Sequence, residues 1–111
     1  MATRTLDWRQ LIVAGSSLGL TGSIGPTGSR ARQVKLYIVF GPGTSAGAVQ
    51  LEEAHSDSFS GTWAALGSPV AWAAANSVKT LVISEPSQAF RVRISTAIVG
   101  GTVDVWALVT D

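Results

Sequence analysis

The residues of this chain best suited to chemistry lie in one acidic stretch, Glu52 to Asp57. Side chains alternate along a strand, so Glu53 and His55 would point to one face and could share a metal ion with Asp57 in the following turn. A zinc site needs several ligands in a rigid arrangement, and His55 is the only histidine of the chain. We therefore predict no metal site and interpret the acidic residues as a charged strand edge that discourages aggregation between sheets.

Other catalytic patterns are equally weak. Nucleophilic attack by one of the serines would need a base, and His55 is the only imidazole that could serve. No spacing selects a carboxylate pair from Glu52, Glu53 and Asp104 for glycoside cleavage. Gly41-Pro42-Gly43 lacks the lysine and the following helix of a phosphate-binding loop. The sequence therefore predicts a protein that is not an enzyme and binds no cofactor.

Four tryptophans in a chain of 111 residues indicate a large core or an interaction surface. Trp63 and Trp72 lie on expected strands, and we predict that they fill the core, where one large ring can contact both sheets of a sandwich. Trp106 shares the outer face of an expected C-terminal hairpin with Arg91 and Arg93. Because Trp and Arg are enriched at protein interfaces, we predict that this face binds a partner.

Short strands separated by turn residues must position these side chains. Residues 34–40 alternate with one fully apolar face, and Gly41-Pro42-Gly43 ends that strand. Similar patterns recur over 46–55, 59–66, 70–72 and 78–85, and no long amphipathic helix pattern occurs. About seven to eight strands without a long helix predict an all-β fold over residues 33–111, an antiparallel β-sandwich or jelly roll.

The clearest expected pair of strands lies at the C-terminal end. Residues 90–99 and 102–109 are joined by Gly100-Gly101, and a two-residue Gly-Gly connection favours a primed hairpin turn. In this register Arg93 lies diagonal to Trp106, close enough to stack on it. The face opposite the core then carries four residues: Arg91, Arg93, Trp106 and Leu108.

Residues 1–32 differ from the rest of the chain and are predicted to form an extended N-terminal arm. Glycine occurs at every third position from Gly19 to Gly28, the period of collagen, but so few triplets cannot form an independent triple helix. The period is compatible with a linker or with arms that meet near a threefold axis. Residues 8–14 could form a short strand or a helical turn. Four arginines against one aspartate give this segment a net charge of +3.

Composition excludes several classes of partner. Charged residues make up 14% of the chain, against roughly 25% in an average soluble domain, so we expect part of the surface to be buried against a partner or another copy. The scattered arginines are too few to predict a nucleic-acid partner.

The Leu11–Ala14 run is too short for a signal peptide or a membrane helix, and without cysteine there is no disulfide.

Three stretches of the sequence resemble small β-rich proteins of tailed bacteriophages. They are Ser45–Ala54, Phe59–Gly67 with its Gly61-Thr62-Trp63, and Val92–Ser95, and the resemblance extends over roughly Val34 to Val109. It implies a capsid decoration (cement) protein, a small β-domain that clamps neighbouring capsomers, is often trimeric and often uses an extended terminal arm.

The function implied by this resemblance is that of a non-enzymatic virion protein on the outside of a phage head, assembled in the host cytoplasm. Its partner would be the major capsid protein, with a homotrimer favoured and no nucleic-acid or membrane partner. The arm would reach a neighbouring subunit by adding a strand or an apolar anchor. The expected arm anchors are Trp8, Leu11, Ile12 and Val13, and the protein–protein face would include Arg91, Arg93, Trp106 and Leu108.

Two alternatives belong to other parts of a phage particle. One is a receptor- or carbohydrate-binding module of a tail or fibre, in which Trp63 near Asp57 or Trp72 near Asn76 would contact the sugar. The other is a minor subunit of the tail tube or connector, for which ring-shaped oligomers would be diagnostic.

Overall fold

The computed structural model describes residues 8–23, 33–56, 59–84 and 89–110, which form nine strands and no helix. None of the described segments could therefore cross a membrane as a helix. The strands are β1 (Arg9–Gly15), β2 (Thr21–Ser23), β3 (Gln33–Phe40), β4 (Ala46–Ala54), β5 (Ala64–Ala65), β6 (Val70–Ala71), β7 (Ser77–Ile83), β8 (Ala89–Val99) and β9 (Val103–Thr110).

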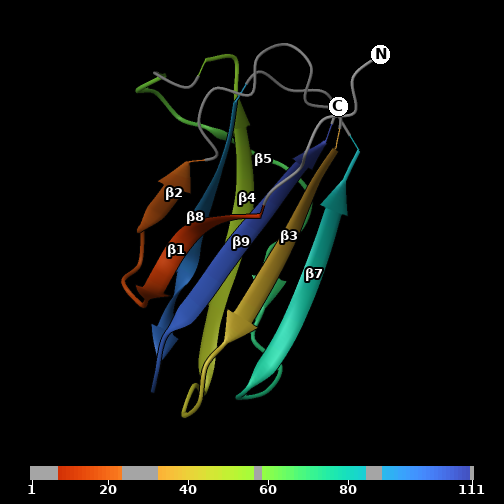
Figure 1. Ribbon diagram of the computed structural model, residues 1–111. Helices are drawn as coiled ribbons and strands as arrows, with labels where there is room; N and C mark the ends of the chain where they lie inside the picture. The colour runs from red at the N-terminus through yellow and green to blue at the C-terminus, as the bar shows by residue number, and fades with distance from the viewer. Residues whose placement is uncertain (1–7, 24–32, 57–58, 85–88, 111) are drawn as a thin grey trace.

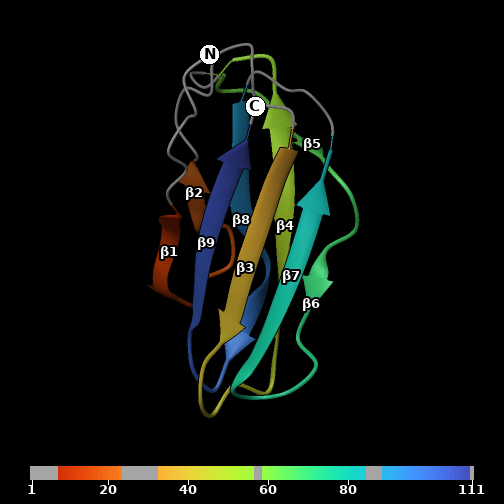
Figure 2. The same ribbon diagram turned by 45° about the vertical axis from the view of Figure 1, so that its right-hand side comes forward.

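The strands form two antiparallel sheets that pack face to face (Figures 1 and 2). The front sheet has the order β1-β9-β3-β7, and the back sheet has the order β2-β8-β4-β5, with β6 also paired to β4. This arrangement confirms the predicted all-β antiparallel sandwich. Residues 8–14, for which the sequence left strand and helical turn open, lie largely in strand β1.

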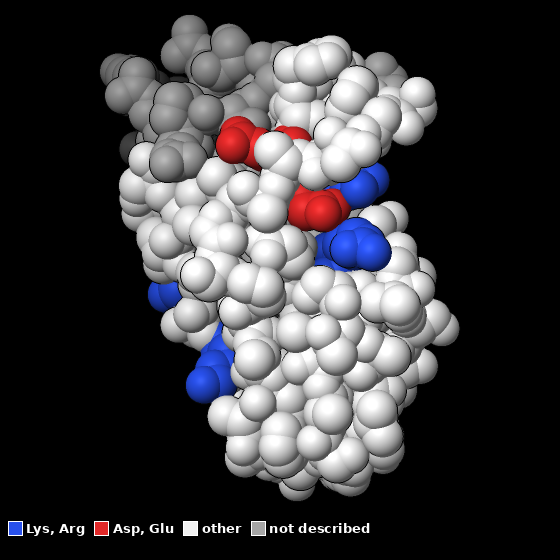
Figure 3. Space-filling model, turned by 180° about the vertical axis from the view of Figure 1, so that it is seen from behind, with Lys and Arg blue, Asp and Glu red and all other residues white. Residues whose placement is uncertain are grey.

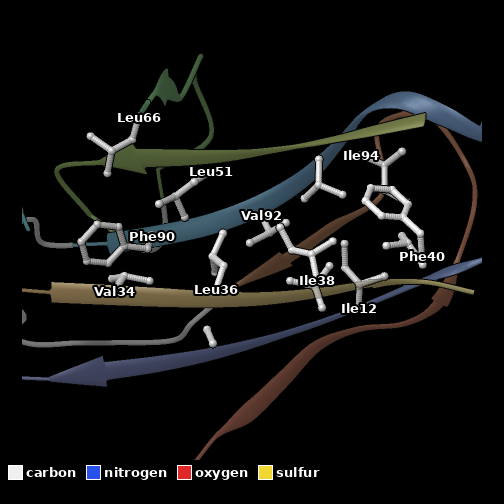
Figure 4. Packing of buried hydrophobic residues seen from close by; sticks show 14 of the residues in the cluster. Ile12, Val34, Leu36, Ile38, Phe40, Leu51, Leu66, Phe90, Val92 and Ile94 are labelled. Carbon is white, nitrogen blue, oxygen red and sulfur yellow. The ribbon is translucent and has the colours of Figure 1, made fainter. Parts of the chain in front are cut away.

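The core between the sheets follows from strict alternation along the central strands. On β3, Val34, Leu36, Ile38 and Phe40 are fully buried, while the residues between them face outward. Figure 4 shows these side chains meeting those of the back sheet, including Leu51 on β4 and the buried residues of β8, Phe90, Val92 and Ile94. Each such side chain contributes about 1.5–3 kcal/mol on burial, so the two sheets are held together mainly by apolar contact.

The predicted C-terminal hairpin is wrong, because β8 and β9 belong to different sheets. Val92 on β8 pairs with Leu51 on β4, whereas Trp106 on β9 pairs with Tyr37 on β3. The groups that would close a hairpin are engaged elsewhere, since the Val99 carbonyl accepts from Ser45 N at 2.8 Å. At the start of β9 the Thr102 carbonyl is likewise bound by the loop after β3, because it accepts from Gly41 N at 2.9 Å.

Two glycines explain how this crossing is built. Gly100 has a φ of +84°, which favours glycine, and a Cβ there would collide with the backbone carbonyl of Gly43. Gly43 itself has a φ of +82°, so the β8–β9 connection and the β3–β4 loop pack backbone against backbone. The Gly-Gly signal therefore marks a close crossing between sheets and not a two-residue turn.

The predicted arm is also wrong for residues 9–23, which are strands of the sandwich. β1 pairs with β9 along one edge of the front sheet, and β2 pairs with β8 along one edge of the back sheet. Ile12 is 2% exposed and belongs to the core. Gly22 lies where a Cβ would collide with the Leu11 backbone carbonyl, so close packing requires this glycine. The rest of the predicted arm, residues 1–7 and 24–32, lies outside the described residues.

The first prediction tests whether β1 packs on the core or belongs to a free arm. Replacing Ile12 by Ala should lower the free energy of unfolding by about 2–5 kcal/mol, because it leaves a cavity between the sheets. Val13 is 70% exposed, and Val13→Ala should change stability by no more than about 0.5 kcal/mol. Urea unfolding followed by circular dichroism measures both. Equal and small effects of the two substitutions would show that β1 does not pack on the core.

Candidate interaction surface

Three aromatic side chains gather on the outer face of the front sheet. Tyr37 on β3 and Trp106 on β9 are direct cross-strand partners, and Trp8 directly precedes β1. The ring centroids of Trp8 and Tyr37 are 6.0 Å apart at 69°, and those of Tyr37 and Trp106 are 6.3 Å apart at 70°. Both pairs have the edge-to-face geometry that aromatic rings prefer, which fixes the three rings relative to one another.

The three rings line an open hollow of ≈ 320 Å³. Trp8 is 43% exposed and Tyr37 is 38% exposed, and Trp106 is half-buried. Together the rings expose apolar area in one place, and covering that area with a partner would remove it from water. The hollow can therefore receive an apolar group from another molecule.

Apolar residues extend this surface across β3 and β7. Val39 pairs with Val78, and Lys35 pairs with both Val82 and Leu108, so these side chains lie in rows beside the rings. Val78 and Val82 are nearly half exposed, and Leu108 and Val39 are partly buried. We call this surface the aromatic face; it consists of Trp8, Tyr37, Val39, Val78, Val82, Trp106 and Leu108.

Few charges accompany the aromatic face. Of the described residues that the register places on the outer side of the front sheet, Lys35 and Asp104 are charged. Asp104 Oδ1 accepts hydrogen bonds from Ala14 N at 2.8 Å and from Gln10 Nε2 at 3.2 Å, so this carboxylate ties β1 to β9. Lys35 is the remaining charge beside the rings. The surface is suited to an uncharged, apolar partner group.

The structure divides the residues that the sequence selected as an interface. Trp8, Trp106 and Leu108 lie on the aromatic face. Leu11 packs partly against the core, Ile12 is inside it, and Val13 is exposed on the edge strand β1. An apolar anchor that reaches a neighbour therefore cannot include Ile12.

Arg91 and Arg93 do not lie beside Trp106, as predicted, because β8 belongs to the back sheet. Arg91 Nε donates to Glu52 Oε1 at 2.7 Å, and its guanidinium stacks 4.6 Å from the centre of the Trp63 ring. These two contacts of Arg91 hold the segment after β4 against the outer side of the back sheet. The predicted stacking of Arg93 on Trp106 is therefore wrong, and the cation–π contact that the structure does show joins Arg91 to Trp63.

The two tryptophans predicted for the core have different environments. Trp63 is 6% exposed, as expected of a buried ring, and its Nε1 donates to the Phe59 carbonyl at 2.9 Å, but it packs on Arg91 at the outer side of the back sheet and is not part of the core cluster between the sheets. Trp72 is half-buried, packs against the core and donates to Thr44 Oγ1 at 3.1 Å. Trp63 therefore offers no open ring to a sugar.

The residues considered for catalysis serve other contacts. The His55 ring packs 4.8 Å from the Phe59 ring, and Asp57 lies outside the described residues. Within the described segments, no three His, Cys, Asp or Glu side chains come close enough to hold a metal ion. Two stretches, Gly15–Gly19 and Gly43–Gly47, match the Gly-x-Ser-x-Gly pattern of a nucleophile elbow. Each joins two strands, whereas an elbow joins a strand to a helix, so the pattern has no catalytic context here.

Sequence reasoning missed Tyr37 and the two exposed valines of β7. Tyr37 lies at an outward position of the alternating run over residues 34–40, and that parity could have identified it. The valines of β7 carry no such signal, because the polar Lys79 takes the inward register there and only the structure shows that the valines are exposed. Their meeting with Trp106 depends on the pairing of β3 with β9 and β7, which the sequence did not reveal.

Comparison of the chain with protein-family models, with curated proteins and with solved structures found no match. The aromatic face itself is therefore the main observation on which a function can be proposed.

The second prediction concerns which tryptophans water reaches. In acrylamide quenching, Trp8→Phe should remove the most easily quenched part of the emission, because Trp8 is 43% exposed. Trp63→Phe should leave the quenchable part nearly unchanged, since Trp63 is 6% exposed. Trp106→Phe should give an intermediate result. Loss of the quenchable emission in the Trp63 variant instead would contradict the described burial.

Proposed function

We propose that this chain is a non-enzymatic structural protein that binds another protein through its aromatic face, as a decoration protein on the outside of a phage head. The observation that carries the proposal is the open cluster of Trp8, Tyr37 and Trp106 beside exposed valines on one sheet. Interface hot spots are enriched in such rings, and the sparse charge of the chain fits a surface that is covered when assembled. The resemblance over residues 34–109 supports the phage head as the place.

The proposed mechanism is additive. A head shell under internal pressure fails where capsomers separate, and a protein bound across neighbouring subunits raises the free energy of that separation. Several copies joined as a trimer would bind with an effective concentration that multiplies modest single contacts. A few central rings can supply most of the binding energy of each contact, typically about 2 kcal/mol or more per hot-spot residue. The rigid sandwich keeps these rings in place before binding.

The contact with the neighbouring subunit is assigned to the aromatic face instead of residues 9–23. Those residues are strands of the sandwich, with Ile12 in the core, so a truncation of residues 1–32 would remove part of the fold. Point substitutions on exposed residues are therefore the appropriate test of binding.

The same rings favour a second candidate, a carbohydrate-binding module of a tail or fibre. Aromatic faces around an open hollow can stack on a sugar ring, and the hollow of ≈ 320 Å³ has three such rings. The rings are inclined by 69° and 70° and do not form a flat platform for several sugar units. The site would lie at Trp8, Tyr37 and Trp106 and not at Trp63.

The third prediction separates these candidates by copy number. Quantitative mass spectrometry of purified particles should find the chain in a ratio to the major capsid protein near that of a lattice-covering protein. A handful of copies per particle would favour the tail or fibre and make glycan binding the next assay. Absence from particles would refute both virion roles.

The fourth prediction uses a matched pair of exposed valines. Val78 on the aromatic face is 46% exposed and Val99 on β8 of the back sheet is 52% exposed, so Asp at either position should leave the fold intact. Val78→Asp should weaken binding to heads that lack the protein by at least about tenfold, because Val78 pairs with Val39, and an unpaired charge is costly in an apolar interface. Val99→Asp should stay within about twofold of the unsubstituted protein.

Sedimentation of heads with increasing amounts of each variant gives the two affinities, and circular dichroism confirms that both variants are folded. Equal binding of the two variants would show that the aromatic face is not the contact surface.

A further inference from the structure

The outer side of the back sheet has a different chemistry from the aromatic face. Arg91 and Arg93 lie there on β8, opposite Ser23 and Thr21 of β2 and opposite Glu52 and Gln50 of β4. Figure 3 shows this side of the molecule: acidic and basic atoms adjoin in its upper half, and further basic atoms appear separately at the left edge. The acidic atoms visible on this side therefore all lie close to basic ones in one polar area.

Arg91 is already neutralised within the chain. Its Nε donates to Glu52 Oε1 at 2.7 Å, and the Trp63 ring covers its guanidinium at 4.6 Å. Both partners are largely buried, since the Arg91 and Glu52 side chains are 24% and 10% exposed. This pair adds no net charge to the surface, and its position is fixed by packing on both sides.

Arg93 lies on the same face two residues further along β8 and is half-buried. Within the described residues its guanidinium has no hydrogen-bond acceptor and no carboxylate partner. β8 lies between β2 and β4, so Gln50 borders Arg93 on one side and Thr21 on the other. Gln50 cannot neutralise it, because its amide is neutral and donates to the carbonyls of Leu51, Leu66 and Gly67 at 2.7, 3.4 and 3.2 Å.

A partly buried guanidinium without an anion is an incomplete interaction. It has lost part of its hydration, and its five N–H donors in a fixed planar fork match the two oxygens of a carboxylate. The exposed hydroxyl of Thr21, directly across the β2–β8 pair, can donate to the same anion. The Arg91–Glu52 pair lies next to Arg93 along the strands and limits the movement of the side chains around it.

We propose that Arg93, with Thr21, binds one carboxylate of a protein partner on the side of the sandwich opposite the aromatic face. A single carboxylate fits better than a chain of phosphates, because Arg93 is the one cation of this site that is not already neutralised within the described residues. The strands of the back sheet contain no other Lys or Arg besides the neutralised Arg91. Protein surfaces that bind nucleic acids usually contact many phosphates through several Lys and Arg side chains.

This inference goes beyond the proposed function, because it describes a second binding surface with its own chemistry. The aromatic face suits an apolar group, and Arg93 suits an acidic side chain. Either surface could fail its test without affecting the other, since they lie on different sheets.

The fifth prediction is tested by NMR titration of the full chain with N-acetyl-glutamate amide at constant ionic strength. The Arg93 Nε–H and Thr21 amide signals should shift and approach saturation, and neutral N-acetyl-glutamine amide should not move them. Arg93→Gln should weaken the binding by about tenfold or more, the loss expected for a hydrogen bond between charged groups. Lys35→Gln removes the same charge from the other sheet and should leave the titration unchanged.

Three results would overturn the proposal. One is an equal response in Arg93→Gln, and another is an equal loss in Lys35→Gln, which would indicate a general charge effect. The third is tighter binding of a short single-stranded oligonucleotide at the same signals, which would assign the site to phosphates. Arg93→Lys keeps the charge without the planar fork and should bind the glutamate derivative more weakly than the unsubstituted chain.

Discussion

The burial of alternate side chains of β3 and β8 between the two sheets is the constraint on which the rest of the structure depends. Leu36 and Ile38 face Val92 and Ile94 across the core, and all four are fully buried. Because side chains on a strand alternate, this burial forces the residues between them outward. A slip of one residue in either strand would move the apolar set into water, so the positions of the outward residues are strongly fixed.

The crossing at Gly100-Gly101 decides which outward residues share a surface. Had β8 paired with β9, the arginines of β8 would lie beside Trp106. The loop Gly41–Ser45 forms hydrogen bonds with the carbonyls of Val99 and Thr102. β9 then continues in the front sheet, where it pairs with β3 and β1. One connection thus separates the aromatic rings from the arginines and places them on opposite sides of the sandwich. A local signal for a tight turn cannot distinguish these outcomes, because both need glycine with positive φ.

The sequence was sufficient for the features that depend on local patterns. Alternation identified the long strands β3, β4, β7, β8 and β9, the sandwich and the outward position of Trp106. It failed where long-range pairing decides the result. The Gly, Ser and Thr content of residues 9–23 is typical of a linker, yet Ile12 fits into the core and Gly22 allows close packing. The aromatic hollow was missed for the same reason, since it joins residues from three distant segments.

The two outer faces have different consequences for binding. Apolar rings provide affinity without strong orientation, whereas a planar guanidinium recognises an anion in one geometry and adds specificity. Tyr37, Trp106 and Arg93 lie on paired strands and Trp8 directly precedes β1, so the backbone of the sheets holds each surface before a partner arrives. Because the sheets lie back to back, one partner group cannot contact both surfaces. A chain that used both would therefore hold two partner groups, and each contact would raise the effective concentration of the other.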